Sequence, residues 1–300
     1  MANKDISENQ KQTKDVFSFK WGKKNTYDSE PFKAEVRRWG LERYFNGNIE
    51  ELENLIGDNK KKFLDAGCGS GNSALSIFGN SLSKVRYFGV DISDAIDICK
   101  ERFIENDIKG SFFKCSINNM PNEINDFDII FSEGVLHHTD SCEKSIFDLS
   151  KRLKKGGKFL FYVYIKKAPI REYTDDLVRE HVSKMDNQEA WDEIMALTKL
   201  GKKLGELDIK IDIDEDIPFL GIKSGTYDLQ RLFYYKICKA YYKKEYSIEE
   251  MNHINFDWFM PKNCFRYSPE EIKNFCEKAY LEIERIKIDE AGISVIATKK

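Results

Sequence analysis

Residues 62–72 read K-F-L-D-A-G-C-G-S-G-N, and this pattern predicts the first unit of a nucleotide-binding α/β domain. An apolar run ends in three glycines at alternate positions, and residues 73–79 follow with apolar side chains spaced to bury one helix face. Glycines permit positive φ angles and let a ligand approach the backbone closely. The start of the following helix offers free N–H groups to a carboxylate or phosphate.

Two acidic residues indicate which ligand this turn holds. The dinucleotide fingerprint G-x-G-x-x-G is broken, because Asn72 stands where its third glycine belongs. Asp65, at the tip of the first predicted strand, would repel a pyrophosphate but suits a cation. The next predicted strand, 84–90, ends in Asp91, which is placed to accept hydrogen bonds from two ribose hydroxyls. A ribose joined to a positively charged, amino-acid-like tail describes S-adenosylmethionine.

At these residues the chain resembles the class I S-adenosylmethionine-dependent methyltransferases, whose first motif is an acid followed by G-x-G-x-G. Two further stretches are similar to that family. The predicted strand 127–131 runs into S-E-G-V-L-H-H at 132–138, and a predicted helix over 143–153 leads through K-K-G-G into a strand over 158–165. A helix over 269–278 and a strand hairpin over 281–298 resemble the end of the family's domain.

The resemblance implies an α/β, Rossmann-like, seven-stranded and mostly parallel sheet with an antiparallel last strand. It covers residues 60–165, the S-adenosylmethionine-binding core, and 268–300, the helix and hairpin that complete it. Residues 1–59 are expected to form a tail, disordered over 1–15, and a cap helix over 31–45. Residues 166–267 are extra, and we expect a helical lid that shapes the acceptor pocket, with helices over 173–207 and 228–244 and a loop over 255–261.

The resemblance also implies cofactor contacts for particular residues. The acid and glycines of the first motif are expected to hold the methionine moiety, Asp91 the ribose, and Ile92 with the residues after the third strand the adenine. Glu133, at the tip of the fourth strand, can face the amino group or the acceptor. Two residues of the N-terminal segment are candidates for closing over the ligand. The predicted cofactor-binding set is Asp65, Gly67, Gly69, Gly71, Asp91, Ile92, Ser116, Ile117, Glu133, Trp21 and Arg37.

Candidates for acceptor chemistry lie in the loop after the fourth strand and in the lid. A hydroxyl acceptor needs a general base, and His137 and His138 are the best candidates because histidine accepts a proton near neutral pH. Metal ligation by these histidines and Cys142 is not expected, since no carboxylate cluster accompanies them. Charge and stacking can recognise an anionic or sugar-like acceptor. The predicted substrate-binding set is Arg171, Tyr173, Arg231, Tyr234, Tyr235, Trp258 and Arg266.

Composition limits the partners and the compartment. The net charge of −3 makes an obligate nucleic-acid partner unlikely, because neutralising phosphates requires a concentrated basic surface. The seven cysteines are odd in number and never in C-x-x-C spacing, which favours reduced thiols. The N-terminus is polar, and no apolar run approaches the roughly 20 residues that cross a bilayer. We therefore expect a cytoplasmic protein with no membrane partner and no bound metal.

The sequence thus predicts methyl transfer from S-adenosylmethionine to a small-molecule acceptor, for which a sugar or nucleotide-linked metabolite is our hypothesis. Two alternatives remain open. A tRNA methyltransferase would need one basic face formed by Lys23, Lys24, Lys166, Lys167 and Arg171. A non-catalytic module that binds S-adenosylmethionine would show an occluded acceptor pocket. An NAD-dependent oxidoreductase is disfavoured by Asp65 and Asn72.

Overall fold

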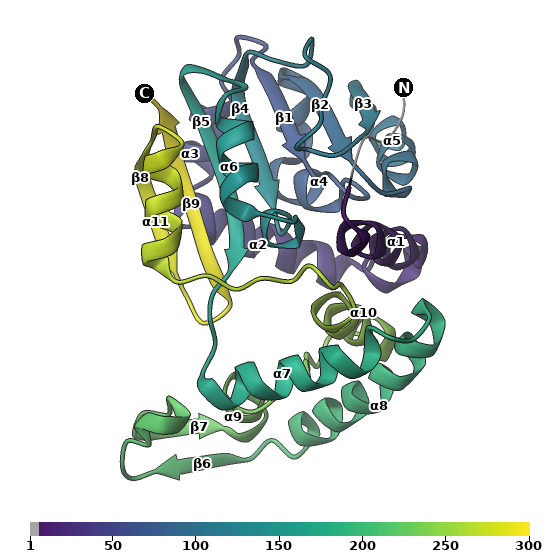
Figure 1. The fold of residues 1–300 in the computed structure, drawn as a ribbon, viewed down its shortest axis with the longest axis vertical. Coiled ribbons are helices and arrows are strands. Elements are labelled where there is room, and N and C mark those ends of the chain that lie inside the picture. The colour runs from purple at the N-terminus through teal and green to yellow at the C-terminus, as the bar shows by residue number, and fades with distance from the viewer. Residues whose placement is uncertain (1–5) are drawn as a thin grey trace.

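A seven-stranded sheet forms the centre of the computed structural model, which describes residues 6–300. Its strands are ordered β3-β2-β1-β4-β5-β9-β8 (Figure 1). Their bounds are β1 (Lys62–Ala66), β2 (Arg86–Asp91), β3 (Gly110–Lys114), β4 (Phe127–Glu133), β5 (Leu153–Tyr164), β8 (Leu281–Ile288) and β9 (Gly292–Lys299).

The pairing of the strands confirms the predicted fold class. β3, β2, β1, β4 and β5 are mutually parallel, whereas β9 pairs antiparallel with both β5 and β8. Because the carboxyl ends of parallel strands meet at one edge, Asp65, Asp91 and Glu133 are brought to the same side of the sheet. The resemblance therefore predicted the antiparallel closing strand correctly.

Helices cover both faces of the sheet, and successive residues of a strand serve opposite faces. Phe63 packs with α2 (Glu30–Phe45), α3 (Ile49–Ile56), α4 (Asn72–Phe78) and α5 (Ala95–Glu105). Leu64 packs on the other face with α6 (Cys142–Ser150) and α11 (Pro269–Lys278). Short 3₁₀ turns add to the connections, namely η1 (Lys24–Thr26), η2 (Gly79–Lys84), η3 (Leu136–His138) and η4 (Pro218–Leu220).

The N-terminal segment is ordered where the sequence predicted disorder. Residues 1–5 lie outside the described part of the chain, but α1 (Glu8–Gly22) begins well before residue 15 and is capped by the Ser7 side chain. Its Val16 is 1% exposed and packs with Trp191 and Phe256 of the lid. The polar composition of this segment hides its few inward-facing residues, so the prediction of disorder over 1–15 is wrong from Glu8 onward.

The inserted segment, residues 166–267, which we call the lid, is mainly helical, and its helices differ in bounds from those expected. They are α7 (Pro169–Val182), α8 (Asn187–Glu206), α9 (Leu229–Lys236) and α10 (Ile248–Phe259). A two-stranded hairpin of β6 (Lys210–Ile213) and β7 (Gly225–Asp228) was not predicted. The predicted helix over 173–207 is broken where the Asp186 side chain caps α8, and the helix predicted over 228–244 stops at Lys236.

The loop predicted over 255–261 is wrong, because those residues mostly belong to α10. A capping box of Ser247 and Glu250 starts this helix, and Asn255, Phe256 and Trp258 are buried along it. Asn255 satisfies its buried amide by accepting a bond from the Tyr241 backbone and donating to Thr198. The buried face of α10 includes polar residues, so the sequence lacks the regular apolar spacing that would have predicted a helix here.

Both ends of the lid are attached to the core at the same place, near the carboxyl ends of the strands. Ile165 pairs with Tyr267 in an isolated parallel bridge, so the inserted segment leaves and re-enters the core side by side. In Figure 1, α7, α8, α9 and α10 lie together beyond the sheet, with α1 between the sheet and α10. Within residues 6–300, no helix combines the length and apolar character needed to cross a membrane.

Candidate functional site

A cavity of about 980 Å³ lies between the strand ends, α1, α2 and the lid. We call it the central cavity. Its core side is formed by the carboxyl ends of β1, β2 and β4, and its far side by α10, α7 and the residues around α9. One continuous space therefore connects the glycine loop, residues 67–71, with the aromatic side chains of the lid.

The glycine loop depends on the absence of side chains. Gly67 and Gly69 have φ angles of +85° and +51° and line the central cavity. A Cβ on Gly67 would lie 2.3 Å from Val135 Cγ1, and one on Gly69 would lie 3.0 Å from Trp21 Nε1. Gly71, with φ +77°, instead faces Cys99 and does not line the cavity. Its contribution is the turn into α4, so a direct ligand contact is not supported for this residue.

Asp91 holds the glycine loop against the end of β2. Its Oδ2 accepts a hydrogen bond from the Gly69 amide at 2.8 Å, and its Oδ1 accepts from the Ser93 amide at 2.7 Å and from the Ser93 hydroxyl. Burial raises the pKa of the Asp91 carboxyl. The carboxylate lines the central cavity, so it is both a structural anchor and a group that a ligand can contact.

Asp65 lines the same end of the cavity and is 3% exposed. Tyr87 donates a hydrogen bond to its Oδ2 at 2.7 Å. Burial raises the pKa of Asp65 to about 7, with the negative charge of Asp91 adding to the effect. A cation bound beside Asp65 would favour the ionised carboxylate, since opposite charges stabilise each other in a water-poor site.

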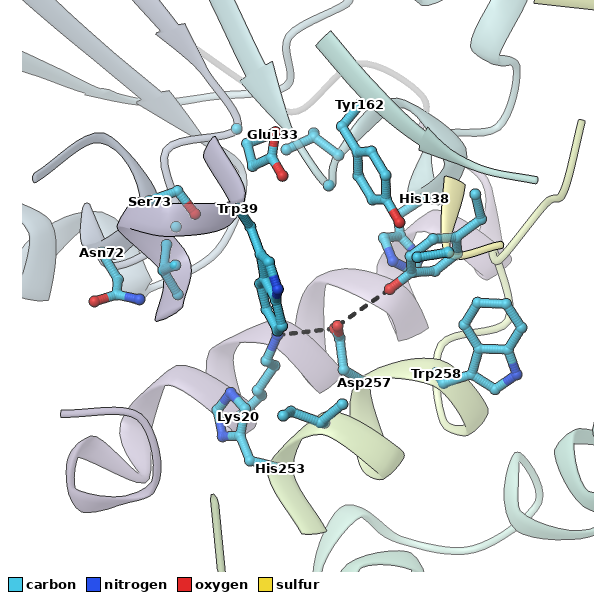
Figure 2. Close-up of a pocket in the computed structure, with 18 of the residues that line it drawn as sticks. Lys20, Trp39, Asn72, Ser73, Glu133, His138, Tyr162, His253, Asp257 and Trp258 are labelled. Atoms are coloured by element: carbon cyan, nitrogen blue, oxygen red, sulfur yellow. Dashed lines mark hydrogen bonds and ion pairs between the residues drawn. The ribbon is translucent and has the colours of Figure 1, made fainter. Parts of the chain in front are cut away.

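Glu133 reaches the cavity from the tip of β4, where Arg43 of α2 neutralises it and Tyr44 of the same helix donates a hydrogen bond. Arg43 and Tyr44 both donate to its carboxylate, and the Arg43 guanidinium lies 3.9 Å from the ring centroid of Tyr162. Figure 2 shows Glu133 beside Tyr162 and Trp39 at the cavity wall. The α2 cap helix therefore contributes a charge partner to the strand tip, as well as apolar cover.

The remaining predicted cofactor residues divide into two groups. Ile92, Ser116, Ile117 and Trp21 line the central cavity. Arg37 does not, because its guanidinium donates to the backbone carbonyls of Ser76 and Ile77 near the end of α4, at 3.3 and 3.1 Å. The structure therefore does not support the prediction that Arg37 contacts the ligand. Its positive charge instead stabilises the carbonyl groups at the C-terminus of α4.

The two histidines have different surroundings. His138 lines the cavity, and its Nδ1 lies 2.6 Å from the Asn263 carbonyl, which can only accept. Nδ1 therefore carries the proton, and Nε2, which has no partner among residues 6–300, keeps a free lone pair. Burial lowers the pKa of His138 to about 4. His137 is fully buried behind it, with its ring centroid 3.8 Å from that of Tyr164, and does not line the cavity.

An ion pair between α1 and α10 lies beside His138. Lys20 Nζ is 2.8 Å from Asp257 Oδ1, and the Tyr164 hydroxyl is 3.4 Å from Asp257 Oδ2. Figure 2 shows this pair between His253 and His138. Neither Lys20 nor Asp257 was predicted from the sequence. A signal for Lys20 was present in residues 16–22, where one lysine stands among aromatic residues that a core would bury.

Five of the seven predicted substrate residues line the cavity, namely Arg171, Arg231, Tyr234, Tyr235 and Trp258. The other two do not. Tyr173 is 67% exposed, on the outside of α7. Arg266 forms ion pairs with Glu172 and Asp176 at a separate shallow cavity. Both residues were predicted from residue type alone, and neither side chain faces the central cavity.

Several cavity residues were not predicted. They are Trp39 on α2, Tyr162 and Tyr164 at alternate positions of β5, and Lys167, Lys239 and Tyr241 of the lid. Tyr162 and Tyr164 are two residues apart in a strand, so their side chains lie on the same face. Two polar hydroxyl groups on one face of an otherwise apolar strand end are the signal that could have indicated a cavity there. In the part of the chain that the structure describes, no group of three or more histidine, cysteine or acidic side chains is placed to hold a metal ion.

Comparisons with known proteins give a family, relatives and a fold. A family model described as a methyltransferase domain matches residues 57–208. The tRNA U34 carboxymethyltransferase of Vibrio cholerae is 30% identical over 166 residues, which cover 54% of this chain and 50% of the relative. The enzyme of that name from Shewanella pealeana is 29% identical over 235 residues, 65% of this chain and 69% of the relative. The chain thus spans about half the length of the Vibrio cholerae relative.

Among solved structures, magnesium protoporphyrin IX methyltransferase (ChlM) from Synechocystis PCC 6803 with bound SAM is similar over 100% of both chains. Its TM-score is 0.51 at 11% sequence identity. At this identity the likeness shows the fold alone.

Proposed function

This chain belongs to the S-adenosylmethionine-dependent methyltransferase domain family and is an enzyme of that class, and we propose that its acceptor is a small molecule held in the central cavity. One observation carries the proposal. A single cavity of about 980 Å³ joins the acidic glycine-loop end to the aromatic lid. Sites of this size and lining bury most of a small ligand. A sugar or nucleotide-linked metabolite fits the tyrosines and arginines of the lid.

The residues at the core end fit S-adenosylmethionine. Gly67 and Gly69 present only backbone to the cavity, because a Cβ at either position would crowd Val135 or Trp21, and two carboxylates stand beside them. Asp65 and the glycine loop would hold the cationic methionine moiety, and Asp91 would accept from the ribose. Ile92, Ser116 and Ile117 would border the adenine. When bound, S-adenosylmethionine supplies an electrophilic methyl group on its sulfonium.

The chain's own residues would position the acceptor and exclude water. α1 and the lid close the cavity over the strand ends, and methyl transfer depends strongly on such alignment. His138 Nε2, with its free lone pair, would take the proton from a hydroxyl acceptor as the methyl group is transferred. Because burial lowers the pKa of His138 to about 4, the ring is neutral and able to accept at neutral pH, but it is a weaker base than an exposed histidine. A thiol or amine acceptor would need no such base.

Calorimetric titration tests the cofactor assignment. We expect S-adenosylmethionine to bind the purified protein and NAD not to bind. Asp91→Asn is the milder variant for the ribose role, because it keeps one of the two oxygens that accept from the Gly69 and Ser93 amides, whereas Asp91→Ala removes both. Asp91→Asn should weaken S-adenosylmethionine binding about tenfold or more, since a charged acceptor is lost. Unchanged affinity would refute the ribose role.

A tRNA acceptor is the second candidate, and the relatives favour it over the small molecule. The curated proteins described above are tRNA U34 carboxymethyltransferases. The charges argue the other way. Lys24 pairs with Glu101, Lys166 with Glu271, and Arg171 is 1% exposed. Lys167 lines the central cavity, so the five basic residues required for an RNA face do not form one exposed surface.

Transfer of a labelled methyl group separates the two candidates. The protein is incubated with methyl-labelled S-adenosylmethionine and either total tRNA or a tRNA-free metabolite extract of a bacterial cell. If the acceptor is a small molecule, the label should appear in the metabolite fraction. Any binding of tRNA should then disappear between about 50 and 200 mM salt, because non-specific contacts with phosphates weaken over that range. Label in tRNA would overturn the small-molecule proposal and support the second candidate.

A further inference from the structure

We propose that the acceptor carries an oxyanion, a carboxylate or a phosphate, and that Lys239 on the lid side of the central cavity binds it. This inference rests on the proposed function and names the chemical class of its substrate. It follows from the way in which charge is distributed between the two ends of the cavity.

Lys239 is a buried lysine whose pKa is lowered by burial to about 7, although Asp257 and Asp175 lie close enough to favour its charged form. It lines the central cavity, is 5% exposed, and its Nζ lies 4.7 Å from the ring centroid of Trp258. Within residues 6–300, no carboxylate forms an ion pair with that ammonium group. Charged side chains are seldom buried without a partner, because removal from water is costly. An anionic ligand would supply the missing partner.

The acids near Lys239 are occupied by other groups. Asp175 Oδ2 accepts from Arg171 Nε at 2.5 Å and from Trp258 Nε1 at 2.8 Å. Asp257 pairs with Lys20. Asp175 Oδ1 accepts a hydrogen bond from the backbone amide of Lys239 and not from the ammonium group of that lysine.

A second lysine adds to the positive charge of this wall. Lys167 Nζ lies 5.5 Å from the Trp258 ring centroid and lines the cavity. It donates to the backbone carbonyls of Glu290 and Ala291, which carry no net charge. Within residues 6–300, neither Lys167 nor Lys239 forms an ion pair, whereas the glycine-loop end of the cavity presents the carboxylates of Asp65 and Asp91.

This polarity suits a cationic methyl donor at one end and an anionic acceptor at the other, because complementary charge orients both reactants. The oxyanion would also lie near the reacting region. The Tyr164 ring centroid is 4.5 Å from that of Trp258 and 5.7 Å from that of His138. An acceptor bound by Lys239 therefore extends past the proposed base toward the glycine loop.

The test uses full-length protein saturated with S-adenosylhomocysteine, titrated calorimetrically with pyrophosphate, citrate and glucose. The two anions distinguish phosphate from carboxylate recognition, and glucose is the neutral probe. We expect one anion to bind and glucose not to bind. Lys239→Met should weaken that anion's binding about tenfold or more, because a charge-assisted hydrogen bond is lost. Lys239→Arg should stay within about threefold of the wild type.

Lys243→Met is the matched control, because Lys243 lines the same cavity but is already neutralised by Glu35 at 2.8 Å. It should leave anion affinity unchanged. Thermal unfolding without anion adds a second readout: Lys239→Met should raise the midpoint, since a buried amino group without an ion-pair partner is replaced by an apolar side chain. Absence of anion binding to the wild type, equal affinities of Lys239→Met and wild type, or a lower midpoint for Lys239→Met would overturn the proposal. Failure of S-adenosylhomocysteine to bind would instead refute the proposed function.

Discussion

The Asp65 carboxyl is placed so that its charge responds to pH near neutrality. Its pKa is raised by burial to about 7, well above its ordinary value. Between those two values the folded protein holds a proton that the unfolded chain has lost, so the stability of the ligand-free protein falls as pH rises through this window. A bound cation reverses the preference, because it attracts the ionised form.

We therefore predict that the affinity for S-adenosylmethionine rises as pH increases through about 7. Asp65→Asn keeps the acceptor for Tyr87 but not the charge, so it should bind about tenfold more weakly above pH 7 and show little pH dependence. Calorimetry between pH 5.5 and 8.5 measures both effects. Asp58→Asn, at an exposed carboxyl, is the control. A pH dependence that persists in Asp65→Asn would assign the titration to another group.

The two adjacent histidines should respond differently to substitution. If the acceptor is a hydroxyl, His138→Ala should lower kcat by about 10²- to 10⁴-fold and leave S-adenosylhomocysteine affinity unchanged. His137→Phe keeps the aromatic packing on Tyr164 and removes two ring nitrogens that lack partners among the described residues. It should preserve turnover within about threefold and not lower stability. Steady-state kinetics and thermal unfolding provide the readouts, and equal losses in both variants would indicate packing.

At the scale of elements, α1 is attached to α10 through charge as well as through apolar contact. The side chains of Lys20 and Asp257 are 7% and 21% exposed, so the pair is largely removed from water. Removing one partner leaves the other charge buried and unpaired, which costs more than removing both.

Lys20→Met should lower the free energy of unfolding by about 2–4 kcal/mol, and Lys20→Met with Asp257→Leu should lower it by less. Urea unfolding of the wild type, both single variants and the double variant completes the cycle. Lys23→Met, at the residue that follows α1, is the control, since among the described residues the Lys23 side chain makes only a 3.3 Å bond to Gln188 and ring contacts. Strictly additive losses would show that the two charges do not depend on each other.

At the scale of the molecule, the core and the lid have separate interiors. The buried members of the two clusters that flank the sheet include no residue of 166–267. The other two clusters join lid residues to Val16 of α1, and to Tyr27 and Phe32 near α2. The Ile165–Tyr267 bridge brings the ends of the lid together.

We predict that a short glycine-serine linker in place of residues 166–267 leaves a folded core. Circular dichroism should show a cooperative thermal transition, and α1 should become sensitive to protease because its lid contacts are gone. S-adenosylhomocysteine binding should weaken, and methyl transfer should be lost with the acceptor wall. The full-length protein is the control. A variant without a cooperative transition would mean that the lid is part of the core's folding unit.

The sequence by itself determined the parts of the protein that local patterns encode. Apolar strands, the three glycines and the acids at strand tips predicted the first α/β unit and the cavity positions of Asp65 and Asp91, because a strand end and a tight turn are recognisable from adjacent residues. The family resemblance that these residues carry implied the seven-stranded sheet and its antiparallel last strand. α11 over Pro269–Lys278 was predicted to the residue for the same reason.

Only the tertiary structure decided which side chains of distant segments meet. α1 is folded through contacts with residues more than 150 positions away, and α10 is buried on a face that includes polar residues. Lys239 and Asp257 carry no distinctive local pattern, Tyr173 and Arg266 were assigned to the site by residue type alone, and Arg37 was assigned by its place in the cap helix. The physical reason is that burial and the direction of a side chain depend on packing between elements, which spacing along one element does not encode.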